Sequence, residues 1–207
     1  MIKTLIFDFG DVFINLDKEA TVKSIVRRFG SFSLTSEIES INSNYETGQL
    51  SNNDFISFYK DYFKTEDEDF LMEAWNSIIL DFPEYRLNFL KSLAESQRYK
   101  LILLSNTNAL HIEKVIENMT LDRYMEFKSC FDRFYLSHEI GLRKPDPAIF
   151  QFVIAENNLK VEECFYIEDT PEHTISAFQF GIRYWTIIPG KEDVVHLFNK
   201  YQQLFTT

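Results

Sequence analysis

A set of polar residues stands at or near the ends of short apolar runs. They are Asp8, Ser105, Asn106, Lys144, Glu168 and Asp169. Ligands of open parallel sheets bind beyond the carboxyl ends of the strands, so these side chains are expected to meet at one edge of such a sheet. Carboxylates, a hydroxyl and a cation at successive strand ends predict a site for a metal ion and a dianion.

Taken singly, these residues have ordinary structural explanations. An Asp after an apolar strand often caps the next helix, Ser-Asn is a common turn, and a Lys before Pro is usually exposed. The side chains of His111, His138 and His196 show no metal-ligand spacing, and His173 fits the start of a helix. The chemical interpretation therefore rests on the set as a whole.

The apolar runs that would position this set alternate with segments of helical period. Strands are expected at residues 5–9, 101–104, 134–136, 165–167 and 183–187. Such alternation predicts an α/β fold with a parallel sheet covered on both faces. Apolar stripes at helical spacing are expected to be core, and their members are Val22, Ile25, Val26 and Phe29 in one helix and Ile112, Val115 and Ile116 in another.

One long segment between the first two strands shows no convincing strand. Within residues 16–83, aromatic side chains recur at helical spacing from Phe55 to Tyr62, which predicts an all-helical insertion. The acidic run at residues 66–69 precedes an apolar helix and is expected to be a solvated helix start.

Composition narrows the class of protein. A chain of 207 residues with 45% hydrophobic residues has room for one well-packed domain and a modest insertion. Its net charge of -11 argues against a nucleic-acid or membrane partner and favours a small-molecule substrate. Cys130 and Cys164 suit free thiols in a reducing compartment, and the apolar start, which contains Asp8, fits a buried strand. We expect a cytoplasmic protein, either a monomer or a weak homodimer.

Four segments resemble a known family. FDFGDV, LLSNT, GLRKPDPAIF and FYIEDTPEHTISAFQFGI are similar, in order and spacing, to the four motifs of the haloacid dehalogenase-like superfamily. The resemblance spans nearly the whole chain and implies a Rossmann-like catalytic core at residues 1–15 and 84–207, with a helical cap at residues 16–83. YETGQLSNNDF and AWNSIILDFP look like cap segments of the branch that contains sugar phosphatases and β-phosphoglucomutase.

The resemblance implies a phosphoric monoester hydrolase that acts on a small phosphorylated metabolite. Asp8 would be the nucleophile that briefly carries the phosphoryl group, and Lys144 would pair with Asp8 and the phosphate. Ser105 and Asn106 would bind the substrate. The cofactor would be Mg²⁺, with ligands expected from Asp8, the Gly10 carbonyl and Asp169, supported by Glu168. Specificity would come from the cap around residues 45–52.

One position departs from the family pattern. Phosphatases of the family normally carry a second Asp two places after the nucleophile, where this chain has Gly10, with Asp11 one place later. The proton donor is therefore in question, with Asp11, Glu172 and His173 as candidate substitutes. Slow turnover is expected, because a general acid contributes about two to four orders of magnitude in rate.

Alternative functions remain open at this point. A 2-haloacid dehalogenase also uses an Asp nucleophile and also lacks the second Asp, but it needs no magnesium. Glu168 beside Asp169 would then place uncompensated negative charge next to Asp8, which favours the phosphatase. A mutase would depend on the missing acid-base residue, whereas a catalytically weakened phosphate-binding protein would keep the same site. The six glycines form no glycine-rich phosphate loop, which argues against kinases and dinucleotide enzymes.

Overall fold

The computed structural model describes residues 1–205, in which a 5-stranded parallel sheet forms the centre of the molecule. Its strands are β1 (Thr4–Phe7), β2 (Lys100–Ser105), β3 (Arg133–Leu136), β4 (Cys164–Glu168) and β5 (Arg183–Thr186). The order across the sheet is β3-β2-β1-β4-β5, so β1 lies between β2 and β4. Every strand that the apolar runs predict is present, and the predicted α/β fold is confirmed.

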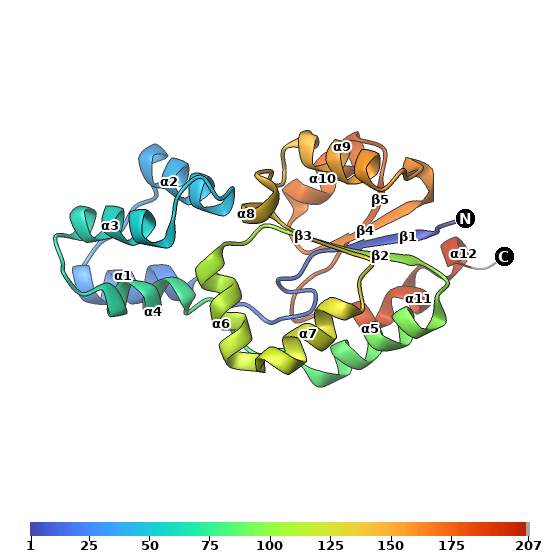
Figure 1. Cartoon of the computed structure of the whole chain (residues 1–207), viewed down its shortest axis with the longest axis horizontal. Helices are drawn as coiled ribbons and strands as arrows, with labels where there is room; N and C mark the ends of the chain where they lie inside the picture. Colours follow the sequence, from blue (N-terminus) through green and yellow to red (C-terminus); the bar gives the residue numbers. More distant parts are fainter. Residues whose placement is uncertain (206–207) are drawn as a thin grey trace.

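Helices cover both faces of this sheet (Figure 1). One face packs on α5 (Glu84–Ser96), α6 (Ala109–Met119), α7 (Leu121–Ser129) and α11 (Leu197–Lys200), and the other on α9 (Pro147–Glu156) and α10 (Pro171–Gln179). Side chains alternate between the faces: Leu101 and Leu103 join the first cluster, whereas Ile102 and Leu104 join the second. Both faces are therefore apolar, which explains the unbroken apolar runs.

Short helices complete this part of the chain. They are α8 (Ser137–Ile140), η1 (Val161–Glu163), η2 (Val194–His196) and α12 (Gln202–Phe205). Among residues 1–205, no helix has the length and apolar character needed to cross a membrane.

A helical unit projects from one end of the sheet, at the left of Figure 1. It contains α1 (Ala20–Phe29), α2 (Ser36–Glu46), α3 (Asn52–Phe63) and α4 (Glu68–Asn76) around its own core, in which Tyr45 stacks on Phe55. The acidic run begins α4 as expected, with the Asp67 carboxylate accepting a hydrogen bond from Phe70 N–H at 3.0 Å. The stripe predicted on α1 is partly wrong, because α1 packs chiefly against α4 and leaves Val22 and Val26 each 38% exposed.

The two chain segments that join this unit to the sheet are paired with each other. The backbone of Asn15 bonds to both Leu80 and Asp81, at 3.0 and 2.9 Å, and Asp17 N–H donates to the Ile78 carbonyl at 3.0 Å. The connection is therefore a short two-stranded ribbon. We propose that residues 16–83 form the cap and move as one unit about this ribbon.

Candidate active site

The ends of three neighbouring strands bring acidic and hydroxyl side chains to one edge of the sheet. Asp8 follows β1, Ser105 ends β2, and Glu168 ends β4 with Asp169 directly after it. All four residues are buried, and Glu168 has no exposed surface. These four residues therefore meet at one edge of the sheet, as expected from the sequence, and they are shielded from water there.

Lys144 links the strand ends. Its side chain is fully buried, and Nζ donates to Asp8 Oδ1 at 2.7 Å, to Glu168 Oε2 at 2.7 Å and to the Leu104 carbonyl at 2.9 Å. Burial alone would lower the pKa of Lys144, but the charges of Asp8 and Glu168 outweigh it and raise the pKa above its ordinary value. Lys144 is therefore a permanently charged ammonium at the centre of the site.

Asn106 positions the backbone of Lys144. Its side-chain oxygen accepts a hydrogen bond from Lys144 N–H at 2.9 Å, and its amide donates to the Lys144 carbonyl at 2.8 Å. The Ser105 hydroxyl has a single long hydrogen bond, of 3.5 Å, to the Asn106 carbonyl. The Asn106 side chain is thus fully used in holding the loop that carries Lys144. The Ser105 hydroxyl can instead donate a hydrogen bond to a ligand.

Both oxygens of Glu168 are occupied by donors. Oε1 accepts from the backbone N–H groups of Asp169 and Thr170 at 3.1 Å each, and Oε2 accepts from the Tyr166 hydroxyl as well as from Lys144. Burial would raise the pKa of Glu168, but the positive charge of Lys144, together with the nearby imidazole of His173, holds it well below its usual range. Glu168 is therefore an ionised anchor for the surrounding groups.

The other two carboxylates are crowded anions. Burial, with the negative charge of Glu168 adding to it, raises the pKa of Asp8 to about 6. Burial, with the charge of Asp8 adding to it, raises the pKa of Asp169 to about 7. Ligand atoms of Asp8, Glu168 and Asp169 lie within 4.8 Å of one another. Three oxygen donors this close, two of them destabilised as anions, fit a divalent cation.

Lys18 belongs to the site although its sequence position gave no sign of it. It follows the ribbon that leads into the cap, and its Nζ contacts Asp169 Oδ2 and lies 3.3 Å from Asp11 Oδ2. Burial lowers the pKa of Lys18, but Asp169 and Asp11 outweigh that effect and raise it. A lysine this far beyond the turn after β1 has no sequence signal, because only the three-dimensional path of the ribbon brings it back to the end of β4.

The turn after β1 explains the glycine at position 10. A Cβ on Gly10 would lie 2.6 Å from Leu16 Cδ1, so the Leu16 side chain occupies the space that a larger residue would need. The positive φ of this turn, 52°, falls at Asp11. The Asp11 carboxylate accepts a hydrogen bond from Leu16 N–H at 3.0 Å and pairs with Lys18 through its other oxygen.

The remaining candidate proton donors lie on α10. Glu172 is exposed, in a surface hollow that it shares with Pro145 and Pro147. His173 is partly buried, and its Nδ1 lies 3.2 Å from Glu168 Oε2. His173 therefore adds to the groups that hold Glu168, whereas Glu172 faces away from the strand-end carboxylates.

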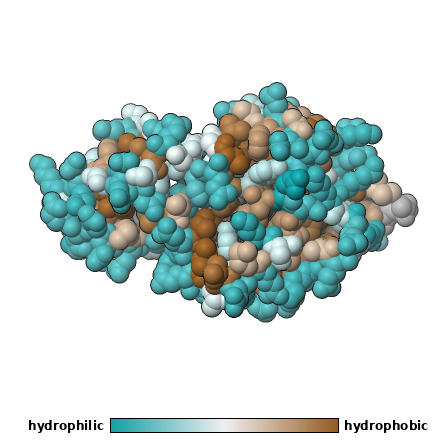
Figure 2. Space-filling model, viewed as in Figure 1, coloured by the Kyte–Doolittle hydropathy of each residue, from teal (hydrophilic) through white to brown (hydrophobic). Residues whose placement is uncertain are grey.

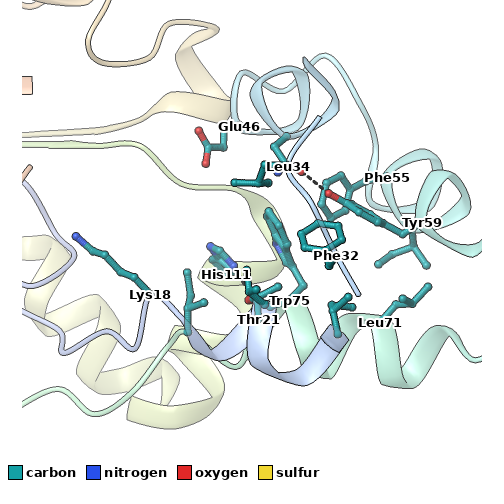
Figure 3. Close-up of a pocket in the computed structure, with 15 residues that line it drawn as sticks. Lys18, Thr21, Phe32, Leu34, Glu46, Phe55, Tyr59, Leu71, Trp75 and His111 are labelled. Atoms are coloured by element: carbon teal, nitrogen blue, oxygen red, sulfur yellow. Dashed lines mark hydrogen bonds between the residues drawn. The ribbon is translucent and has the colours of Figure 1, made fainter. Parts of the chain in front are cut away.

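The cap contributes a cavity of about 210 Å³ next to this site (Figure 3). Trp75, His111 and the ring of Phe55 form apolar walls, and Lys18 and Glu46 carry charge into it. Glu46, at the end of α2, pairs with Arg143 at 2.8 Å, and Gly48 lies so close to α8 that an added Cβ would be 2.1 Å from the His138 carbonyl oxygen. The predicted specificity segment, residues 45–52, thus contacts the core, as do Lys18 and Trp75 elsewhere in the helical unit.

Comparisons with known proteins agree with this geometry. The sequence profile of the family described as haloacid dehalogenase-like hydrolase matches residues 5–187. A variant of a HAD family enzyme from Bacteroides thetaiotaomicron, solved in complex with magnesium and inorganic phosphate, is 30% identical, with a TM-score of 0.84 over 96% of this chain and 99% of its own. D-ribitol-5-phosphate phosphatase from the same organism is 26% identical over 178 residues, which cover 82% of this chain and 84% of that protein.

Proposed function

The chain belongs to the haloacid dehalogenase-like hydrolase family, and we propose that it is a magnesium-dependent phosphatase that hydrolyses a small phosphomonoester through an aspartyl phosphate on Asp8. The observation that carries this proposal is the buried Lys144 ammonium, which joins Asp8 to Glu168 beside Asp169. A buried cation touching a buried nucleophilic carboxylate is arranged to stabilise negative charge during phosphoryl transfer.

The residues divide the reaction between them. The Asp8 carboxylate attacks the phosphorus, the bond to the ester oxygen breaks, and water then attacks the same phosphorus and releases Asp8. Lys144 neutralises charge on Asp8 and the transferring group, and Ser105 donates a hydrogen bond to a phosphoryl oxygen. Asn106 keeps Lys144 in register through its two hydrogen bonds to the Lys144 backbone.

Asp8, Asp169 and the Gly10 carbonyl are the groups that would hold Mg²⁺, with Glu168 as support. Mg²⁺ prefers hard oxygen ligands, and when bound it supplies the positive charge that lets a carboxylate approach a phosphate dianion. Both oxygens of Glu168 accept hydrogen bonds from protein groups, so Glu168 would orient the metal ligands around it.

The cap supports a small polyol or sugar phosphate as the substrate. One relative that is similar over most of the chain is a D-ribitol-5-phosphate phosphatase. The cavity of about 210 Å³ is small, and its apolar walls carry hydrogen-bonding groups on Asn42, Glu46 and Tyr59. Hydroxyl groups of a short polyol chain would find both donors and acceptors there.

The experiment that tests the function combines a substrate screen with a trap. Purified protein should hydrolyse sugar and polyol phosphates with Mg²⁺ and lose that activity in excess chelator. Labelled phosphate should be trapped on Asp8, Asp8→Asn should abolish hydrolysis, and Asp11→Asn should still form the adduct, because Asp11 points into its own turn. Metal-independent release of halide from a 2-haloacid would replace the phosphatase with a dehalogenase.

A further inference from the structure

The proposed phosphatase needs a proton donor that the first motif does not provide. An ester oxygen with a high pKa leaves as an alcohol only if an acid protonates it, and the attacking water must later lose a proton. Position 10 is a glycine whose neighbouring space holds Leu16. Asp11 has committed one oxygen to Leu16 N–H and the other to Lys18. The core side of the site therefore lacks the usual carboxylate.

The cap offers a carboxylate on the opposite side of the site. Glu46 is the one acidic side chain that lines the cap cavity among residues 1–205. Figure 3 shows its carboxylate directed away from α2 toward the core side of the cavity, which Lys18 also lines. A leaving group extends from the phosphorus away from Asp8 in an in-line displacement, which is the direction of the cap.

Arg143 joins Glu46 to the loop that carries Lys144. Arg143 directly precedes Lys144 in the chain, its Nη2 lies 2.8 Å from Glu46 Oε2, and its Nη1 donates to Ser43 Oγ at 3.2 Å. The last turn of α2 is thereby held against the loop that carries Lys144. Glu46 Oε2 is buried against Arg143, whereas Oε1 accepts no hydrogen bond from residues 1–205, and 23% of the side chain is exposed. Glu46 lines the cavity, so Oε1 is the oxygen with capacity for a ligand.

The electrostatics suit a proton carrier. Burial raises the pKa of Glu46, and the charges of Arg143, His173 and Lys144 oppose that rise without cancelling it. These groups lie on the core, so Glu46 is within electrostatic reach of the phosphoryl-transfer residues. A carboxyl group with a raised pKa is better able to give and take a proton near neutral pH.

We propose that Glu46 protonates the leaving-group oxygen and then deprotonates the attacking water, in place of the carboxylate that position 10 lacks. In the first step Asp8 bonds to phosphorus, the phosphorus–ester oxygen bond breaks, and the Glu46 proton passes to that oxygen. In the second, water bonds to phosphorus and gives its proton to Glu46, and the bond to Asp8 breaks. This inference rests on the proposed phosphatase function.

The test compares Glu46→Gln with Glu39→Gln, which alters an exposed glutamate on the same helix. p-Nitrophenyl phosphate has a good leaving group, so Glu46→Gln should still release a burst of p-nitrophenolate equal to the enzyme concentration. Its steady rate should then fall by about 10²–10⁴-fold, because water activation is lost. With a polyol phosphate the same variant should form the phosphoryl enzyme slowly and show no burst. Glu39→Gln should behave as wild type with both esters.

Other results would overturn the assignment in recognisable ways. A raised KM with unchanged kcat for Glu46→Gln would make Glu46 a substrate-binding residue. Equal loss of the burst with both esters would mean that Glu46 acts only by holding the cap closed through its ion pair with Arg143. Arg143→Gln removes the ion pair and leaves Glu46 in place, so it should raise KM and keep the burst. Mg²⁺ affinity measured by calorimetry should be the same in all variants. If the phosphatase function itself is wrong, wild type and Glu39→Gln will hydrolyse neither ester.

Discussion

At the scale of single residues, the site carboxylates differ in what holds them. Glu168 is surrounded by donors from Lys144, Tyr166 and two backbone N–H groups, and its pKa is held well below the usual range. Asp169 lies against the exposed Lys18, and burial raises its pKa to about 7. We therefore propose different roles for these two neighbouring acids: Glu168 anchors the site, and Asp169 is available to a metal.

This difference predicts that substitutions of Glu168 and Asp169 rank in opposite order for their effects on Mg²⁺ affinity and on stability. Asp169→Asn should weaken Mg²⁺ binding more than Glu168→Gln does, because Glu168 is held by the buried Lys144 and Tyr166, whereas Asp169 is held by the exposed Lys18 and by a long 3.4 Å hydrogen bond from the Thr170 hydroxyl. Glu168→Gln should lower the free energy of unfolding more, by about 3–5 kcal/mol, because it leaves the buried Lys144 without a full counter-charge. Calorimetric titration and urea denaturation of both variants give the two orders. The same ranking in both measurements would contradict the division of roles.

The meeting of the strand-end residues at one edge of the sheet was predictable from the sequence. Asp8, Ser105, Glu168 and Asp169 stand at or directly after strand ends, which parallel pairing brings together. Lys144 reaches them from the loop after α8. Lys18 and Glu46 lie in the cap, and their places depend on how two helical layers pack and where a ribbon turns. The periodicity of apolar residues in the sequence contains no information on that packing. Neither Lys18 nor Glu46 could therefore be assigned to the site from the sequence.

At the scale of elements, the turn between β1 and the cap is a packed unit. Gly10 and Asp11 form a bend that Ile14 closes through its carbonyl, and Leu16 fills the space beside Gly10. Sequence comparison identified the missing side chain at position 10. It did not reveal the obstacle, because the clash involves a residue six places further along.

Substitution at this turn should be non-additive. Gly10→Asp should lower the free energy of unfolding by about 1–3 kcal/mol through overpacking against Leu16, and Leu16→Ala should lower it through lost burial. The double variant should be more stable than the sum of the two losses predicts, because the alanine opens the space that the aspartate needs. Chemical denaturation of the three proteins measures this coupling. Strict additivity would mean that the turn relaxes without involving Leu16.

The strands and most helices were predictable, and the exceptions have a physical cause. All five apolar runs became strands because both sheet faces are covered by helices. On α1 the apolar stripe overstated burial, since Val22 faces the cavity and Val26 is half-exposed. A helix that borders a cavity can present apolar side chains to a ligand. Its apolar periodicity in the sequence is then the same as that of a helix buried in the core.

At the scale of the whole molecule, the site lies between two bodies joined by one ribbon. Lys18 reaches from the cap side to Asp169, and Glu46 reaches from α2 to Arg143. Movement about the ribbon would therefore separate charges on both sides of the site at once. Such movement would couple cap opening to site assembly through these pairs.

The crowded carboxylates should also make the stability of the metal-free protein depend on pH. Asp8 and Asp169 have pKa values of about 6 and about 7 in the folded protein, against 3.8 in the unfolded chain. The folded state holds these protons more tightly, so this stabilisation is complete below about pH 4 and is lost as the pH rises through 6 to 7. His111, whose pKa burial lowers to about 4, acts in the opposite direction.

A comparison of variants isolates the carboxylate effect. Relative to Asp169→Asn, metal-free wild type should lose on the order of 1–3 kcal/mol of unfolding free energy between pH 5.5 and 8. Mg²⁺ should restore it at pH 8, because the cation favours the ionised carboxylates. Denaturation curves at the two pH values, with and without the metal, test both statements. Parallel pH profiles for the two proteins would show that Asp169 is not strained by its neighbours.

The contact between Gly10 and Leu16 has a consequence for how this chain could change over generations. A single base change can turn a glycine codon into an aspartate codon, yet the resulting protein would meet Leu16 at once. The obstacle is the end of a flexible and partly buried side chain, so a movement of Leu16 would admit the aspartate at some loss of packing. A smaller residue at position 16 would lower that cost. Positions 10 and 16 are therefore expected to vary together, a carboxylate at one accompanying a smaller side chain at the other.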